Sequence, residues 1–427
     1  MLECWSYTGL VSRMILPLGL NVRSGALSLK SVMLPPAGDA LEREERRVAV
    51  WMCLYHDTIA SAASGWGTSL SLEELSIPLP VAVADFEAGL PDMPMNPQDL
   101  DSIDFWIKHP VADPFVMTLK AIVALNRVNR FVRKWKNRHI RDDDDLDGMQ
   151  RVEFKEMANS IACLQMSFPA SLRDPCKLVS KKRKILDVDL ITAHLLPHCA
   201  IMCLYEPFAD ITDPNDPATR RLQNAAQGVV SIVQQIAGCV QDTSDQTKAL
   251  MHNSASICLL CAARTILLFY RHALNINDQP AIQSYRTDVD MIRMAMAQFG
   301  MKFRIGAHHS QVLEYFLDRA TFPTYEKMAP HYPDHPRTGA PELRRDSNFG
   351  LLVINALNIK RGYWRLSPPA PTQSADVSPM ESTPETSTST VSSSAVSSNH
   401  TSSAADAAAS KWEGDTPSWF LKLMASR

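Results

Sequence analysis

The spacing of apolar residues constrains the fold of this chain more than any other feature of its sequence. In most segments up to about residue 320, apolar residues recur three and four positions apart, and strict alternation is hard to find. Such spacing gathers apolar side chains on one face of an α-helix. One clear stripe consists of Val48, Trp51, Tyr55 and Ile59. The pattern predicts an all-α fold, built as an irregular multi-helix bundle.

Six long segments carry this pattern, and each predicts one helix. They are residues 41–63, 115–135, 150–166, 187–205, 220–240 and 247–274, and shorter helical pieces follow to about residue 318. After Pro368 the composition changes to serine, threonine, proline and alanine, which cannot bury enough apolar surface to offset chain entropy. The sequence predicts an all-α domain over 1–360, a disordered linker over 361–410 and a short amphipathic tail over 411–427.

The tail has two interpretations. Aromatic residues stand close to acidic ones there, as Trp412 does beside Glu413. This pattern suits an activation segment that folds on a partner protein. It equally suits a short helix that docks back on the domain.

Charge and cysteine content indicate the compartment. The formal net charge is −3, so the whole chain presents no basic field to a phosphate backbone. The nine scattered cysteines do not form a disulfide framework, and Arg13 interrupts what would be the apolar core of a signal peptide. The apolar stretch 257–270 contains Arg264 and falls short of the roughly 18–20 residues of a membrane span. We expect an intracellular protein without a membrane segment.

Two cysteine pairs could in principle hold a metal ion. Cys199 and Cys203 lie one helical turn apart, and Cys258 and Cys261 form a C-x-x-C pair. Both pairs stand in leucine- and isoleucine-rich helices, where a free cysteine behaves as a small apolar residue. The interpretation we favour is packing in the core.

Other candidate sites have equally simple interpretations. His308-His309 lacks a further ligand at helical spacing, which favours a helix start or the surface. The aspartates at 142–145 lack the glycine and distal glutamate of a calcium loop, which favours a solvated loop. Phosphate loops, nucleophile elbows and cofactor fingerprints are not found. We therefore predict no catalytic, metal-binding or cofactor-binding residue, and an α-helical enzyme is only a remote alternative.

Two basic runs stand out locally. Lys181, Lys182, Arg183 and Lys184 predict a nuclear-import signal, with a solvated loop as the alternative. The second run interleaves with Trp135 and consists of Arg133, Lys134, Lys136, Arg138 and Arg141. Phosphate contacts are one interpretation of it. We favour a structural one, since cations at the end of a helix also complement the helix dipole.

Several motifs, in a fixed order, resemble one known family. Trp5 and Gly9, followed by Leu18-Gly19-Leu20-Asn21, resemble a tryptophan-bearing helix ending in a leucine-glycine-leucine-histidine turn, with Asn21 replacing the histidine. Residues 42–57 resemble an acidic helix with an arginine pair and a tryptophan. The positions that we carry over as family-motif structural residues are Gly19, Leu20, Arg46, Arg47, Trp51, Asp57, Gly65, Pro80 and Pro207. Gly65-Trp66-Gly67 departs from the family's usual glycine-arginine-proline.

Together these motifs are similar to the fungal-specific transcription factor domain, or middle homology region, of binuclear zinc-cluster transcription factors, over roughly residues 1–320. The resemblance implies a nuclear, pathway-specific regulator of metabolic genes that works through its helical domain. It implies contacts with the transcription machinery or co-regulators and with an import receptor, and it leaves a homodimer open.

In this family a zinc cluster precedes the helical domain, and the N-terminal part of the domain is expected to be incomplete here. Zinc would be a cofactor only of such an upstream cluster, and DNA would be reached only through that cluster or through a partner protein. The alternative is a co-regulator deficient in DNA binding that acts through a partner.

The import signal gives the first prediction. Changing Lys181, Lys182, Arg183 and Lys184 to alanine should move a fluorescent fusion of the whole chain out of the nucleus, because an import receptor binds such side chains through their charge. Fluorescence microscopy measures the nuclear fraction. Unchanged nuclear accumulation would show that the signal lies elsewhere.

Overall fold

The computed structural model describes most of the first 321 residues, all within one compact unit, Met1–Lys360. The described ranges are 2–22, 34–89, 91–136, 148–180, 185–240, 254–300 and 303–321. The predicted linker and tail, the aspartates at 142–145 and the basic run 181–184 lie outside these ranges. They stay predictions.

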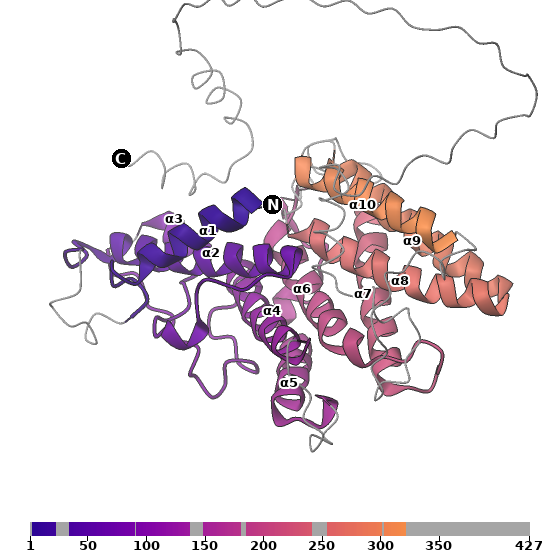
Figure 1. Ribbon diagram of the computed structural model, residues 1–427. Coiled ribbons are helices and arrows are strands. Elements are labelled where there is room, and N and C mark those ends of the chain that lie inside the picture. Colours follow the sequence, from indigo (N-terminus) through magenta and orange to yellow (C-terminus); the bar gives the residue numbers. More distant parts are fainter. Residues whose placement is uncertain are drawn as a thin grey trace, which may run out of the picture. The chain divides into compact units, whose positions relative to one another are not determined.

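Ten α-helices dominate the described residues (Figure 1). They are α1 (Leu2–Ile15), α2 (Ala40–Ser64), α3 (Val83–Ala88), α4 (Pro114–Lys136), α5 (Val152–Met166), α6 (Val188–Tyr205), α7 (Pro217–Val240), α8 (Ala255–Ile276), α9 (Gln279–Gly300) and α10 (Arg304–Thr321). Short 3-10 turns are η2 (Leu72–Glu74), η3 (Gly148–Gln150), η4 (Ala170–Leu172) and η5 (Glu206–Phe208). The predicted all-α fold is confirmed.

The structure differs from the sequence prediction after residue 274 and beside the basic run 181–184. The short pieces expected after residue 274 are in fact two full helices, α9 with 22 residues and α10 with 18. Few residues of α9 are buried, namely Asp288, Val289, Ile292, Met296 and Phe299. The apolar stripe of this helix is therefore narrow, and polar residues interrupt the pattern in its sequence. Two short antiparallel strands, β1 (Leu178–Ser180) and β2 (Ile185–Leu186), also flank the basic run 181–184.

Three helices form the centre of the core. α4 packs on α2, α5 and α6, while α6 also contacts α7 and α8. α8 in turn contacts α7, α9 and α10, and α1 packs on α2. The predicted stripe of α2 is buried at all four positions, Val48, Trp51, Tyr55 and Ile59. The amphipathic pattern in the sequence therefore identified the buried face of this helix correctly.

Two helical segments, Val188–Phe208 and Ala255–Ile276, are long and apolar enough to cross a membrane by length and composition. Of their most apolar windows, 61% and 78% are buried against the rest of the protein, as in a core helix. Arg264 lies inside α8. Both of its terminal nitrogens bond the buried carboxylate of Glu206, with Nη1 2.9 Å from Oε2. A buried guanidinium is tolerated when it is paired in this way.

A buried lysine holds the loop before α4. The Lys120 ammonium donates hydrogen bonds to Gln98 Oε1 at 2.7 Å, Phe105 O at 2.8 Å and Lys108 O at 2.9 Å. It also lies 3.0 Å from Nδ1 of His109. Burial lowers the pKa of Lys120 to about 7. The side chain thus fixes three separate points of the 98–109 loop on α4, a role that its position in an apolar pattern did not reveal.

Trp51 gives a prediction about stability. Its ring is fully buried, and Nε1 donates to the backbone oxygen of Pro78 at 2.8 Å. Trp51→Ala should lower the free energy of unfolding by about 3–5 kcal/mol through lost burial and the cavity left behind. Trp51→Phe keeps most of the ring and should cost less, about 1–3 kcal/mol for the unsatisfied carbonyl.

Urea unfolding of both variants beside the wild type measures these differences. If Trp51→Ala unfolds at the wild-type urea concentration, Trp51 does not stabilise the core. Equal losses in the two variants would assign the effect to the hydrogen bond alone.

Candidate functional site

Two glycines of the family motifs end helical segments in the left-handed conformation. Gly19 has φ 66° in the turn after α1, where its N–H bonds Leu16 O at 3.0 Å. Leu20 closes the same turn through Ile15 O at 3.1 Å. Gly65 has φ 74° and caps α2 through Ser61 O. Because non-glycine residues pay a steric cost at such φ values, glycine suits both positions.

An extended stretch with one short 3-10 turn, η2, leads from Gly65 at the end of α2 toward α3. We call residues 65–81 the clamped segment. Its backbone is held largely by side chains of α2 instead of by strand partners. Asp57 Oδ2 accepts from Ser69 N at 2.6 Å and from Leu70 N at 2.9 Å. Trp51 Nε1 donates to Pro78 O. These contacts satisfy backbone groups that would otherwise be buried without partners.

The far end of the clamped segment is held by a buried ion pair. Glu44 bonds Arg47 one turn along α2, and both side chains are less than a tenth exposed. The other Glu44 oxygen accepts from Val81 N at 2.9 Å. Burial raises the pKa of Glu44, although Arg47 opposes this. Next to it, Asn96 Nδ2 donates to Pro80 O at 2.7 Å.

The other arginine of the pair, Arg46, faces outward. It bonds Glu42 on α2 and donates to Pro35 O at 2.7 Å. The two neighbouring arginines therefore have separate tasks. Arg47 belongs to the buried clamp, while Arg46 holds the chain that leads into α2.

The first turn of the clamped segment also contacts α1 and α4. Trp5 Nε1 donates to Gly67 O at 3.1 Å, and the Trp5 ring meets Trp66 edge-on at 5.0 Å. A Cβ at Gly67 would lie 2.7 Å from Nη1 of Arg133, closer than real Cβ contacts come. Gly67 therefore lies directly against the end of the Arg133 side chain, which would have to shift if position 67 carried a Cβ.

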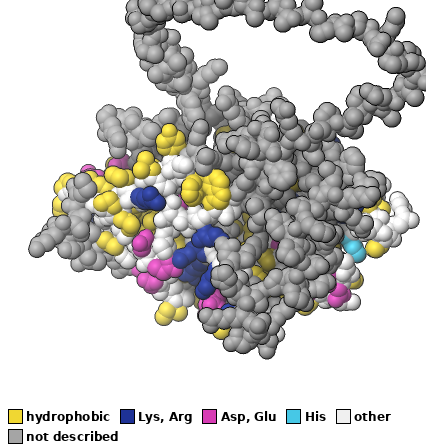
Figure 2. All heavy atoms as spheres, in the orientation of Figure 1, with side chains coloured by type: hydrophobic (Ala, Val, Ile, Leu, Met, Phe, Trp, Pro, Cys, Tyr) yellow, Lys and Arg dark blue, Asp and Glu magenta, His cyan; other side chains and the backbone are white. Residues whose placement is uncertain are grey.

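A groove opens between the clamped segment, α4 and α5. Its volume is about 770 Å³. Its lining includes five cationic side chains, four acidic ones and two aromatic rings. These are Arg127, Arg130, Arg133, Lys134 and Arg151, then Glu73, Asp101, Glu153 and Glu156, and Phe131 and Trp135. Figure 2 shows Lys and Arg side chains gathered beside Asp and Glu on the face that it draws.

Ion pairs and rings order the cations of this groove. Arg130 Nη1 donates to both oxygens of Glu73, at 2.9 and 2.8 Å, and this bonding lowers the pKa of Glu73 to about 2. The Arg151 guanidinium lies over the Trp135 ring, 5.4 Å from its centroid. Such a lining suits a small ligand with an anionic group and a flat apolar body. Arg133 and Lys134 of the second basic run line this groove, while Arg138 and Arg141 lie outside the described residues, so both interpretations of the run stay predictions.

Pro207 lies in η5, directly after α6, and places an aromatic cluster behind the groove. Phe208 packs 5.2 Å from the Trp135 ring and 5.4 Å from Phe154. A Cβ at Gly148 would lie 2.2 Å from Phe208, so glycine is needed for this approach. The end of α6 thus supports the ring of Trp135 in the groove wall.

The cysteine pairs lie in the core, as expected, but the structure also brings them together. Cys199, Cys258 and Cys261 are buried and Cys203 is partly exposed. The sulfur atoms of Cys199, Cys203 and Cys261 lie within 4.8 Å of one another. Only the juxtaposition of α6 and α8 shows this, since the two pairs are more than fifty residues apart.

The prediction for His309 is wrong. It is fully buried within α10, and its Nδ1 lies 3.1 Å from Ser256 Oγ of α8. α10 packs on both α8 and α9, so the histidine faces the core instead of the surface. Burial, followed by the neighbouring His308, lowers the pKa of His309 to about 3.

Residues 2–133 match the family model of the fungal specific transcription factor domain. No curated protein and no solved structure matches the chain. The match runs from the start of α1 to the last turn of α4 and includes the whole clamped segment. This part of the chain is therefore similar to the fungal specific transcription factor domain. The family with this domain has a transcription-factor role and is in general nuclear.

The buried His309 predicts acid sensitivity. Its folded pKa of about 3 lies below the unfolded value of about 6.5, so the unfolded chain takes up this proton first as the pH falls. The free energy of unfolding should therefore decrease below about pH 6.5, by about 2 kcal/mol from this group at about pH 5. Above about pH 7 this group should add no pH dependence.

Urea titrations of the wild type and of His309→Gln at both pH values test this prediction. The variant should lose less stability on acidification than the wild type. If the two proteins lose the same amount, the proton is taken up elsewhere.

Proposed function

We propose that this chain is a pathway-specific regulator of transcription in a fungal nucleus and that it acts through its helical domain. The domain match over residues 2–133 carries the proposal. Its support is that three motif residues, Arg47, Trp51 and Asp57, take part in one set of contacts around the clamped segment. If the likeness to the family were only one of composition, we would not expect these separate motif residues to take part in the same contacts between α2 and the clamped segment.

In this proposal DNA is reached through a zinc cluster outside this sequence or through a partner protein. Sequence-specific binding needs an element that places side chains against base edges. The groove instead mixes cations with carboxylates, and Arg130 is already paired with Glu73. The formal net charge of −3 also favours an indirect route to DNA.

The groove is the place in the described residues where we propose that a signal acts. Its volume is within the usual range of small-molecule sites. One wall, the η2 turn, belongs to the clamped segment, and the opposite wall belongs to α4 and α5. A ligand between these walls would add contacts to both, so it would favour the conformation in which they are close.

The runner-up is a co-regulator that lacks DNA binding and works only by pairing with a partner. An enzyme remains the distant alternative, and we propose that the chain has no catalytic activity. The two regulatory hypotheses predict different DNA binding. If the protein has its own zinc cluster, a chain that includes the cluster should bind a specific DNA sequence by itself. A co-regulator should bind a specific DNA sequence only together with a second protein.

A tethering experiment tests the proposal. The full chain, fused to an unrelated DNA-binding domain, should change the transcript level of a reporter several-fold relative to that domain alone. Lys134→Gln, which alters the groove, should change this output. Lys155→Gln on α5 is the matched control, because it removes an equally exposed lysine that does not line the groove.

Reporter transcript level and nuclear abundance of each fusion are measured together. A fusion that is abundant in the nucleus and leaves the reporter at the level of the DNA-binding domain alone would contradict a role in transcription. Equal outputs for Lys134→Gln, Lys155→Gln and the unchanged chain would remove the groove from the mechanism.

A further inference from the structure

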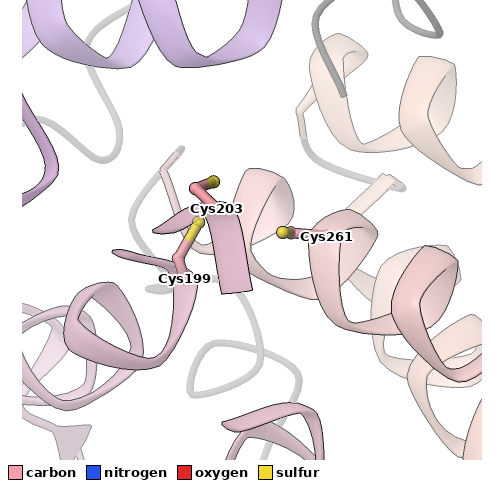
Figure 3. Close-up of side chains that lie close together, drawn as sticks. All are labelled: Cys199, Cys203 and Cys261. Carbon is pink, nitrogen blue, oxygen red and sulfur yellow. The ribbon is translucent and has the colours of Figure 1, made fainter. Parts of the chain in front are cut away.

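Three thiols from two core helices converge on one point. Cys199 and Cys203 lie one turn apart on α6, and Cys261 projects toward them from α8 (Figure 3). Their sulfur atoms are within 4.8 Å of one another. Cys258, one turn before Cys261, interacts with Cys199 but is not part of this close group of three.

The distances are near those of a metal or metalloid centre. Bonds of about 2.3 Å, typical of thiolate ligands on zinc, place the ligand sulfurs about 3.8–4.0 Å apart. The sulfur separations of up to 4.8 Å exceed this range by about 1 Å, a gap that rotation of the cysteine side chains can close. α6 and α8 contact each other directly, so the helices already hold the three thiols in place.

The surroundings decide which ion is suitable. Cys199 and Cys261 are fully buried, while Cys203 is partly exposed. The charged pair nearest in sequence, Arg264 and Glu206, is already mutually neutralised. Three thiolates with a divalent ion would carry a net negative charge, which is costly to bury. A trivalent ion would leave no net charge.

We propose that Cys199, Cys203 and Cys261 form a binding site for trivalent arsenic, taken up as arsenous acid. Each thiol sulfur forms one bond to arsenic as one arsenic–oxygen bond breaks. The thiol proton leaves with the departing hydroxide as water, so three waters are released. Arsenic remains trivalent throughout, and no oxidant or reductant is required.

The product is a neutral pyramidal centre that joins α6 to α8. Soft thiol ligands favour such an ion over hard, oxygen-seeking cations. Because the fold already brings the three sulfurs together, binding at this site stabilises the folded chain. The inference stands on the thiol geometry and does not depend on the proposed function.

The test uses the reduced full chain and sodium arsenite. Native mass spectrometry should show one arsenic bound with the loss of three protons, and the melting temperature should rise. Cys261→Ser and Cys203→Ser should abolish this species. Cys258→Ser and Cys176→Ser, which remove buried thiols outside the group of three, should retain it.

Melting curves without arsenite identify any variant that fails to fold, and Cys261→Ala and Cys203→Ala then replace the serine variants. Parallel titrations use Zn²⁺ and Cd²⁺. Absence of bound arsenic, or an adduct that has lost only two protons and keeps a hydroxide, would overturn the three-thiol site. Tighter binding of Zn²⁺ that is lost in Cys258→Ser would also overturn it, since that result describes a four-thiolate zinc site.

Discussion

The structure depends on how the backbone of the clamped segment is satisfied. A buried extended stretch without strand partners leaves N–H and C=O groups that must find hydrogen bonds elsewhere. Here α2 supplies them through Glu44, Trp51 and Asp57, spaced about two turns apart. One helix thus sets the path of seventeen residues, and that path builds one wall of the groove. Removing a clamp side chain would leave a buried backbone group unpaired, which costs more than the bond itself contributes.

The Glu44–Arg47 ion pair positions the end of the clamped segment more than it stabilises the fold. Desolvating Glu44 and Arg47 offsets much of their attraction, so an apolar pair could pack there at similar stability. An apolar pair could not, however, accept the hydrogen bond of Val81 N. We infer that the pair fixes the end of the clamped segment in register with α2.

Helices whose apolar residues follow one regular spacing could be predicted from the sequence. The stripe of α2 and the bounds of α4 and α6 followed from apolar spacing, because burial of one helix face leaves a regular trace. Prediction from the sequence failed where a polar residue is buried by a partner distant in the chain. The sequence does not show what Lys120, Arg264 and His309 bond, and only their partners elsewhere in the fold explain how these polar side chains are buried.

The groove could not be predicted from the sequence either, because residues that are far apart in the chain form it. Its cations on α4 appeared in the sequence as a basic run at a helix end, but Glu73 and Gly67 lie about sixty residues before them. No local pattern links an acidic turn to such a helix. Glycine at position 67 was noted only as a departure from the family motif. The structure places the end of the Arg133 side chain directly against it.

α6 connects the thiol group to the groove, and its sequence limits how it can do so. It packs on both α4 and α8, and Pro197 lies inside it, two residues before Cys199. A proline there has no N–H to bond the oxygen of Ala193, so the helix is less tightly tied at this point. Two sites influence each other only through an element with two arrangements that both can bias. The part of α6 that follows Pro197 is where the two sites are joined, since it carries two of the thiols and leads directly to Phe208, which packs on Trp135.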